Sequence, residues 1–125
     1  MRILANLTQA DRDNRFETLF DRYYALLNDS VIVAGHLAAD SGTIAKAKPE
    51  LQNKITQRLL NIDKTMQKHK GLVKAYAIDG LNEYYNEAEN KKTILQFVRE
   101  QLTSSSPKTR TKAKQFLRKW SQYPL

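Results

Sequence analysis

Apolar side chains recur along the chain at spacings of three and four residues, as they do on one side of a helix. The first such run contains Phe16, Leu19, Phe20, Tyr23 and Leu27. Later runs follow the same spacing, and no stretch alternates apolar and polar residues between hairpin turns. The pattern predicts an all-α protein. The expected helices span about 15–27, 31–47, 50–62, 72–86, 91–102 and 107–121.

Glycine, proline and short polar segments separate these runs. Ser30 follows Asn and Asp and is placed to cap a helix, while Pro49 suits a first helical turn. The segment 103–107 combines Thr, three Ser and Pro, which is a strong turn and cap signal. Gly35 and Gly42 weaken the helix at 31–47, but small residues there also allow a neighbouring helix to approach closely.

A weak internal repeat underlies the pattern. A shift of 36 residues superposes Lys74 on Arg110 and also aligns three residues of the apolar stripes, Ala77, Leu81 and Tyr84 on Ala113, Leu117 and Trp120. A shift of 75 superposes Leu19, Phe20, Tyr23 and Leu27 on Ile94, Leu95, Val98 and Leu102. Helix pairs that recur every ~37–40 residues predict a helical solenoid, in which stacked pairs build one core.

Three segments, 28–31, 72–78 and 106–113, resemble HEAT repeats of the armadillo-like class, with an Asp or Ser-Pro turn followed by a helix rich in small side chains. The resemblance implies a short right-handed α-solenoid of about three helix pairs. The whole chain, 1–125, would form a single domain with repeats at about 15–48, 50–87 and 91–121. The resemblance also implies an interaction scaffold whose concave surface is lined by the helices at 31–47, 72–86 and 107–121.

Charge is distributed unevenly along the chain. The formal net charge is +8, and residues 1–90 carry as many acidic as basic side chains. The whole excess therefore lies in residues 91–125, where Glu100 is the sole acidic residue. A local positive field attracts anions whatever the average over the chain.

Catalytic and metal-binding chemistry finds little support in the sequence. The chain has no cysteine, which excludes disulfides, thiol catalysis and thiolate metal sites. His36 and His69 lie 33 residues apart without metal-ligand spacing, and His36 is expected to be partly buried. Glu83, Glu87 and Glu89 fit a solvated helix end better than an acid–base pair. We therefore expect no enzyme, no metal and no cofactor.

Two hypotheses of function remain. The first is a non-enzymatic scaffold that binds a protein partner, with contacts on the concave face from seven residues, Asp40, Lys74, Asp79, Glu83, Arg110, Lys114 and Arg118. The second is a nucleic-acid-binding accessory module that uses the basic C-terminal helix through Lys108, Arg110, Lys112, Lys114, Arg118 and Lys119. A helical wheel places Lys108, Lys112 and Lys119 on one flank of the apolar seam, and it places Arg110, Lys114 and Arg118 on the other flank and toward its back.

Apolar residues lie near both ends of the predicted solenoid. Tyr23, Tyr24, Leu26 and Leu27 near one end, and Trp120, Tyr123 and Leu125 near the other, favour a homodimer through apolar ends. The alternative is that segments 1–14 and 121–125 cover these ends. No apolar run approaches the ~18 residues of a spanning helix, and the start lacks the ~7–15-residue apolar stretch of a signal peptide. We expect a cytoplasmic protein that does not contact membranes.

Overall fold

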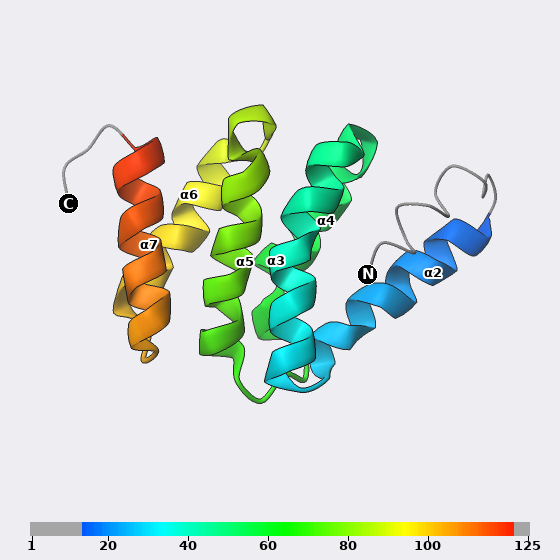
Figure 1. The fold of residues 1–125 in the computed structure, drawn as a ribbon, viewed down its shortest axis with the longest axis horizontal. Coiled ribbons are helices and arrows are strands. Elements are labelled where there is room, and N and C mark those ends of the chain that lie inside the picture. The colour runs from blue at the N-terminus through cyan, green and yellow to red at the C-terminus, as the bar shows by residue number, and fades with distance from the viewer. Residues whose placement is uncertain (1–13, 122–125) are drawn as a thin grey trace.

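A computed structural model describes residues 14–121, which form six α-helices and no β-strand (Figure 1). The helices are α2 (Asn14–Ala25), α3 (Val31–Ala47), α4 (Gln52–Leu60), α5 (Lys70–Tyr84), α6 (Lys91–Glu100) and α7 (Pro107–Trp120). The all-α prediction is confirmed for these residues, and each predicted helix is present. Where the predicted helices are longer, the difference is a single 3₁₀ turn, at Leu26–Asn28, Pro49–Leu51, Ile62–Lys64, Tyr85–Glu87 and Gln101–Thr103.

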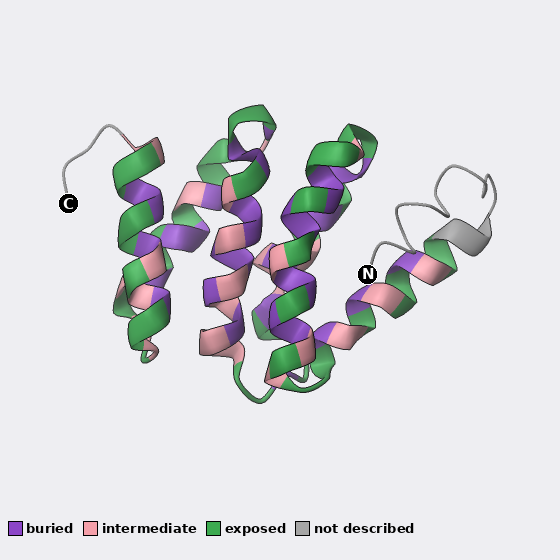
Figure 2. Cartoon of the chain, viewed as in Figure 1, coloured by how far each residue is buried: buried purple, intermediate pink, exposed green. Residues whose placement is uncertain are grey.

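The helices form two layers. Helices α3, α5 and α7 stand side by side in one row, and α4 and α6 lie behind them (Figure 1). Helix α2 continues from the row at an angle, at the N-terminal end. Buried residues gather where the layers face each other, and exposed residues cover the outer sides (Figure 2). Because α3 and α5 touch neighbours on several sides, their apolar residues are not confined to one narrow stripe.

Side-chain caps begin two helices of the row. The Ser30 hydroxyl accepts a hydrogen bond from the Val33 amide, and the Ser106 hydroxyl accepts one from the Thr109 amide, each at 3.3 Å. Both caps follow from the predicted signals, because serine can satisfy an otherwise unpaired amide of the first turn. Pro107 occupies the first helical position of α7.

The start of α5 is fixed differently, by Gln67. Its side chain is buried, and its amide nitrogen donates hydrogen bonds to the carbonyls of Leu27 and Asp29, each at 2.7 Å. Its amide oxygen accepts a hydrogen bond from the His69 backbone at 3.1 Å. The segment 63–71, which its composition presents as a frayed end and loop, is therefore anchored to the preceding helix pair at its centre.

Glycine brings α3 and α5 into direct backbone contact. A Cβ atom added to Gly80 would lie 2.3 Å from the Ala38 carbonyl oxygen, and one added to Gly42 would lie 2.3 Å from the Gly80 carbonyl oxygen. Neither position leaves room for a side chain. The prediction that small residues in 31–47 allow a close neighbour is confirmed, and the glycines do not interrupt α3.

Side chains rather than backbone join α5 to α7. The Thr109 hydroxyl donates to the Gly71 carbonyl at 2.6 Å, and the Trp120 indole N–H donates to the Asn82 side chain at 2.7 Å. Both bonds join residues that are 38 positions apart in the sequence. Tyr85 also packs against the Trp120 ring, with ring centroids 5.0 Å apart.

Buried hydroxyl pairs join α2 to α3 and connect the two layers between α4 and α5. Tyr24 and Ser41 share a hydrogen bond of 2.8 Å, and Tyr84 and Thr56 share one of 2.6 Å. Burial raises the pKa of Tyr84 from 10.0 to about 12, although the bond to Thr56 lowers it. Burial also raises the pKa of Tyr24. Both groups are held in their neutral form.

The apolar N-terminal end is less exposed than its composition suggests. Tyr24 and Leu27 are buried, and Tyr23 and Leu26 are half-buried against the core. At the other end Trp120 is half-buried, while Tyr123 and Leu125 lie outside the described residues. Self-association through these ends stays a prediction.

Candidate functional site

The outer sides of α3, α5 and α7 form what we call the three-helix face. On α5 it contains Leu72, Tyr76, Asp79 and Glu83, spaced by three and four residues and all half-buried or exposed. On α3 the corresponding positions include Ile32, His36 and Thr43, and on α7 they include Lys108, Lys112, Gln115 and Lys119. The expectation that His36 is partly buried is wrong, because His36 lies on the outer side of α3 and is exposed.

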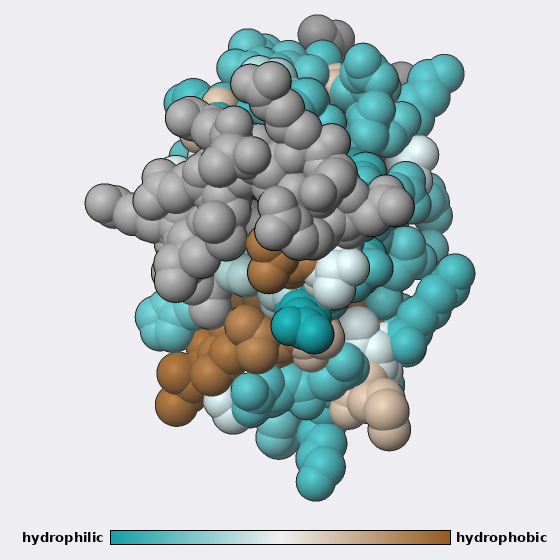
Figure 3. Space-filling model, turned by 90° about the vertical axis from the view of Figure 1, so that its right-hand side faces the viewer, coloured by the Kyte–Doolittle hydropathy of each residue, from teal (hydrophilic) through white to brown (hydrophobic). Residues whose placement is uncertain are grey.

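Two large apolar residues in the described part of the chain are exposed, and one of them lies on the three-helix face. The Ile32 side chain, in the first turn of α3, is 70% exposed. Figure 3 shows apolar surface beside the grey atoms at the N-terminal end of the molecule. The other exposed large apolar residue in the described part is Met66, which lies in the loop before α5 and lines a separate depression between α2 and α4.

Tyr76 connects the three helices of this face. Its ring lies over Gly35 of α3, where an added Cβ atom would be 3.0 Å from the ring. From the other side, the Lys108 ammonium group lies 4.4 Å from the ring centroid and donates a hydrogen bond of 2.9 Å to the tyrosine hydroxyl. The ammonium group and the ring attract each other in this arrangement.

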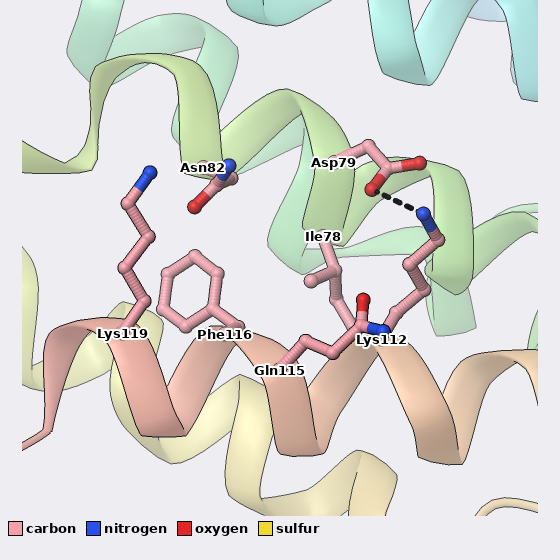
Figure 4. Close-up of a pocket in the computed structure, with 7 residues that line it drawn as sticks. All are labelled: Ile78, Asp79, Asn82, Lys112, Gln115, Phe116 and Lys119. Atoms are coloured by element: carbon pink, nitrogen blue, oxygen red, sulfur yellow. Dashed lines mark ion pairs between the residues drawn. The ribbon is translucent and has the colours of Figure 1, made fainter.

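A small groove separates α5 from α7, and we call it the α5–α7 groove. Its volume is about 110 Å³, and it is lined by Ile78, Asp79, Asn82, Lys112, Gln115, Phe116 and Lys119. Lys112 and Lys119 stand at opposite ends, with Ile78 and Phe116 between them (Figure 4). Lys112 forms an ion pair of 3.1 Å with Asp79. Lys119 lies 4.8 Å from the Trp120 ring centroid.

Two residues of the predicted scaffold site, Lys74 and Arg110, turn toward the loops before their own helices. The Lys74 ammonium group lies 2.7 Å from the Asp63 carboxylate, and the Arg110 guanidinium donates to the Ser104 carbonyl at 2.6 Å. These two residues are the ones that the 36-residue shift superposes. Each holds the loop within its own helix pair, so neither extends over the three-helix face.

The other predicted residues divide between three surfaces. Asp79 and Glu83 lie on the three-helix face, where the Glu83 side chain passes over Gly42. Asp40 lies near Tyr23 of α2, since its charge raises the pKa of that phenol after the larger effect of burial. Lys114 and Arg118 are exposed on the side of α7 that points away from α5.

The basic side chains of α7 lie on two flanks of the helix, as the helical wheel predicts. Lys108 and Lys112 reach α5, whereas Arg110 reaches Ser104. Lys108, Lys114, Arg118 and Lys119 are exposed, and Lys112 is half-buried. Positive charge is therefore present both along the α5–α7 groove and on the outer side of α7.

The described residues contain no group of three or more His, Asp or Glu side chains that could hold a metal ion. No helix in residues 14–121 is both long enough and apolar enough to cross a membrane. The α5–α7 groove is smaller than the roughly 300–1,000 Å³ typical of pockets for small molecules and cofactors, whereas the depression between α2 and α4, with about 470 Å³, lies within that range.

No family model, no curated protein and no solved structure matches the chain. Its function must therefore be argued from its own surface.

Several residues of this surface are missing from the sequence-based sites. Tyr76 and Leu72 belong to the apolar stripe of α5 by spacing alone, although a wheel at about 100° per residue places them at its edge. That edge position is the signal that could have identified them. Asn82 and Gln115 carry no comparable signal, because their role depends on the separation of two helices.

Proposed function

We propose that the protein is a short right-handed α-solenoid of three HEAT-like helix pairs that acts as a non-enzymatic scaffold for protein–protein interaction. The single observation that carries the function is the composition of the three-helix face. An exposed Ile32, a half-exposed Tyr76 and charged residues on both sides of them share one surface. Exposed apolar side chains with a polar rim are typical of protein interfaces, and tyrosine is enriched where binding energy concentrates.

The contacts between pairs support the solenoid part of the proposal. Gln67 and Asp29, Thr109 and Gly71, and Trp120 and Asn82 are each joined by a hydrogen bond across 38 residues. A separation of this length lies within the 20–45 residues that are typical of one structural repeat, in which each unit contacts only its neighbours.

The experiment compares two charge-introducing variants of exposed apolar residues. Ile32→Glu changes the three-helix face, and Met66→Glu changes a loop away from it, so both introduce the same side chain at a largely solvated position. Tagged wild type and variants, expressed at native abundance in the source cells, are cross-linked and purified, and co-purifying proteins are quantified. We expect a stoichiometric partner with wild type and Met66→Glu, and its loss with Ile32→Glu.

Two results would contradict the scaffold. One is a wild-type protein that never recovers a stoichiometric partner. The other is equal recovery by both variants, which would exclude the three-helix face, the surface on which the proposal rests. Thermal unfolding of both variants shows that the substitutions leave the fold intact.

Nucleic-acid binding is the second candidate, and the charge of α7 favours it. Lys108, Lys114, Arg118 and Lys119 are exposed, and residues 91–125 hold the entire excess of +8. Phosphate binding releases counterions, so affinity for labelled DNA or RNA should fall steeply with salt. A variant with Gln at Lys108, Lys112, Lys114 and Arg118 should lose this binding for all sequences alike. Unchanged anisotropy in that variant would exclude the mechanism.

A further inference from the structure

The α5–α7 groove is the part of the three-helix face that has a defined shape. Ile78 and Phe116, 2% and 3% exposed, form its apolar floor. Asn82 and Gln115 add amide groups along its sides (Figure 4). A volume of about 110 Å³ lies below the range of cofactor pockets, so any occupant of the groove is small.

Positive charge exceeds negative charge along this groove. Lys108, Lys112 and Lys119 follow one side of α7, and among the described residues Asp79 is the one carboxylate paired with any of them. The Lys108 ammonium group contacts the Tyr76 ring and hydroxyl, and that of Lys119 contacts the Trp120 ring, and within residues 14–121 neither is paired with a carboxylate. At a helical rise of 1.5 Å per residue, Lys108 and Lys119 are about 16 Å apart along the axis, so a short peptide could reach both.

We propose that the α5–α7 groove binds an acidic peptide segment of a protein partner. One apolar side chain of the peptide lies over Ile78 and Phe116, and flanking carboxylates face Lys119 at one end of the groove and Lys108, one turn of α7 beyond Lys112, past the other end. This inference rests on the proposed scaffold function and names the chemistry of its partner. Lys112, already paired with Asp79, holds the wall of the groove and does not bind the peptide.

The groove fits an acidic peptide better than a nucleic acid. The Asp79 carboxylate lies in the groove wall, and its side chain is 40% exposed. Glu83 is exposed one turn further along α5. Both would repel a continuous phosphate backbone, whereas a peptide can place its carboxylates at the two ends and an apolar residue beside Asp79.

The test uses the full chain and three labelled probes. The first is a peptide of about nine residues with glutamates around one central leucine, and the second replaces the leucine with alanine. The third is an oligodeoxythymidine of the same length. Binding is measured by fluorescence anisotropy at low and physiological salt, and the contact surface by ¹⁵N chemical-shift changes. We expect the leucine peptide to bind about tenfold more tightly than the alanine peptide, because burial of the larger side chain strengthens binding. We expect the largest shifts at Ile78, Phe116 and Lys119.

Two variants on the same helix locate the binding charge. Lys119→Glu reverses a charge at the end of the groove, and Lys114→Glu makes the same change on the outer side of α7. We expect the first to weaken binding of the leucine peptide about tenfold and the second less than twofold. Thermal unfolding confirms that both variants keep the fold.

The inference is overturned if the two peptides bind equally well, if both variants weaken binding equally, or if no peptide binds. Tighter binding of the oligonucleotide than of the leucine peptide would replace the acidic peptide with a nucleic acid. Failure here is distinguishable from failure of the scaffold. If Ile32→Glu abolishes partner recovery from cells while Lys119→Glu does not, the scaffold stands and the groove has no part in it.

Discussion

Helix α5 touches its two neighbours in the row in different ways. Against α3, Gly42 and Gly80 let the backbones meet, and no space remains between the helices. Against α7, an ion pair and three hydrogen bonds span a wider separation, and a groove remains. The difference shows how one fold can present a closed surface and an open one side by side. Residue size at two positions decides which contact closes, since a helix pair approaches only as far as its largest facing side chain allows.

The largest expected effect on stability comes from adding a methyl group where the backbones of α3 and α5 meet. Gly80→Ala puts a methyl group 2.3 Å from the Ala38 carbonyl oxygen, so α3 and α5 must separate along their whole length. We expect the free energy of unfolding to fall by about 3 kcal/mol or more in urea titrations.

Gly71→Ala is the matched control, because its added Cβ atom would lie 3.5 Å from the Ser104 hydroxyl, an ordinary contact. This change should leave stability the same or raise it by up to about 1 kcal/mol, since alanine favours the helix and restricts the unfolded chain. Similar losses from both variants would refute the view that the α3–α5 contact is unusually close.

An intermediate effect is expected from alkali, which tests the packing behind α3 and α5. Tyr84 has a pKa near 10 when unfolded and about 12 when folded, so its neutral form stabilises the native state. That contribution is complete below pH 10 and is lost as the pH rises toward 12, on the order of 2–3 kcal/mol. Chemical denaturation at pH 8, 10 and 11.5 measures it. Tyr84→Phe should show a shallower decline, and an identical pH slope would contradict the assignment.

The smallest effect on stability is expected at the contact between α5 and α7. Asn82→Ala removes the acceptor of the Trp120 indole N–H and should lower the free energy of unfolding by about 1 kcal/mol. The chain has one tryptophan, so a red shift of its emission reports this site alone. Asn86→Ala, at an exposed position beyond α5, is the control and should change neither quantity. A loss as large as that of Gly80→Ala would remove the distinction between the two contacts.

The sequence is sufficient to predict the helices and the caps at Ser30 and Ser106, because these depend on residues close together in the chain. It also predicts the close approach at Gly42 and the two flanks of α7. It does not predict that Gly80 faces Ala38, since that depends on the register between helices. For the same reason the groove and the ring of Tyr76 over Gly35 could not be foreseen. Gln67 was missed because a glutamine in a polar loop has no local pattern that marks it as buried.

The exposure of His36 is a further example. An alanine-rich helix suggests burial all round, but within residues 14–121 α3 has neighbours on the sides of α2, α4 and α5 and none on its outer side. Burial of residues in such a helix depends on how many helices pack around it, and this cannot be read from the composition of one helix.

The 38-residue spacing of the contacts between pairs has a consequence for how the chain folds. Gln67 reaches Asp29, and Trp120 reaches Asn82, each across the same short stretch of chain. Each pair can therefore dock on its neighbour after closing a loop of about 40 residues, for which the entropic cost grows only slowly with length. Proteins in which each unit contacts only its neighbours can begin to fold at one unit and extend from it. Folding that begins at the α3–α5 contact can then extend toward α7 without waiting for distant parts of the chain to meet.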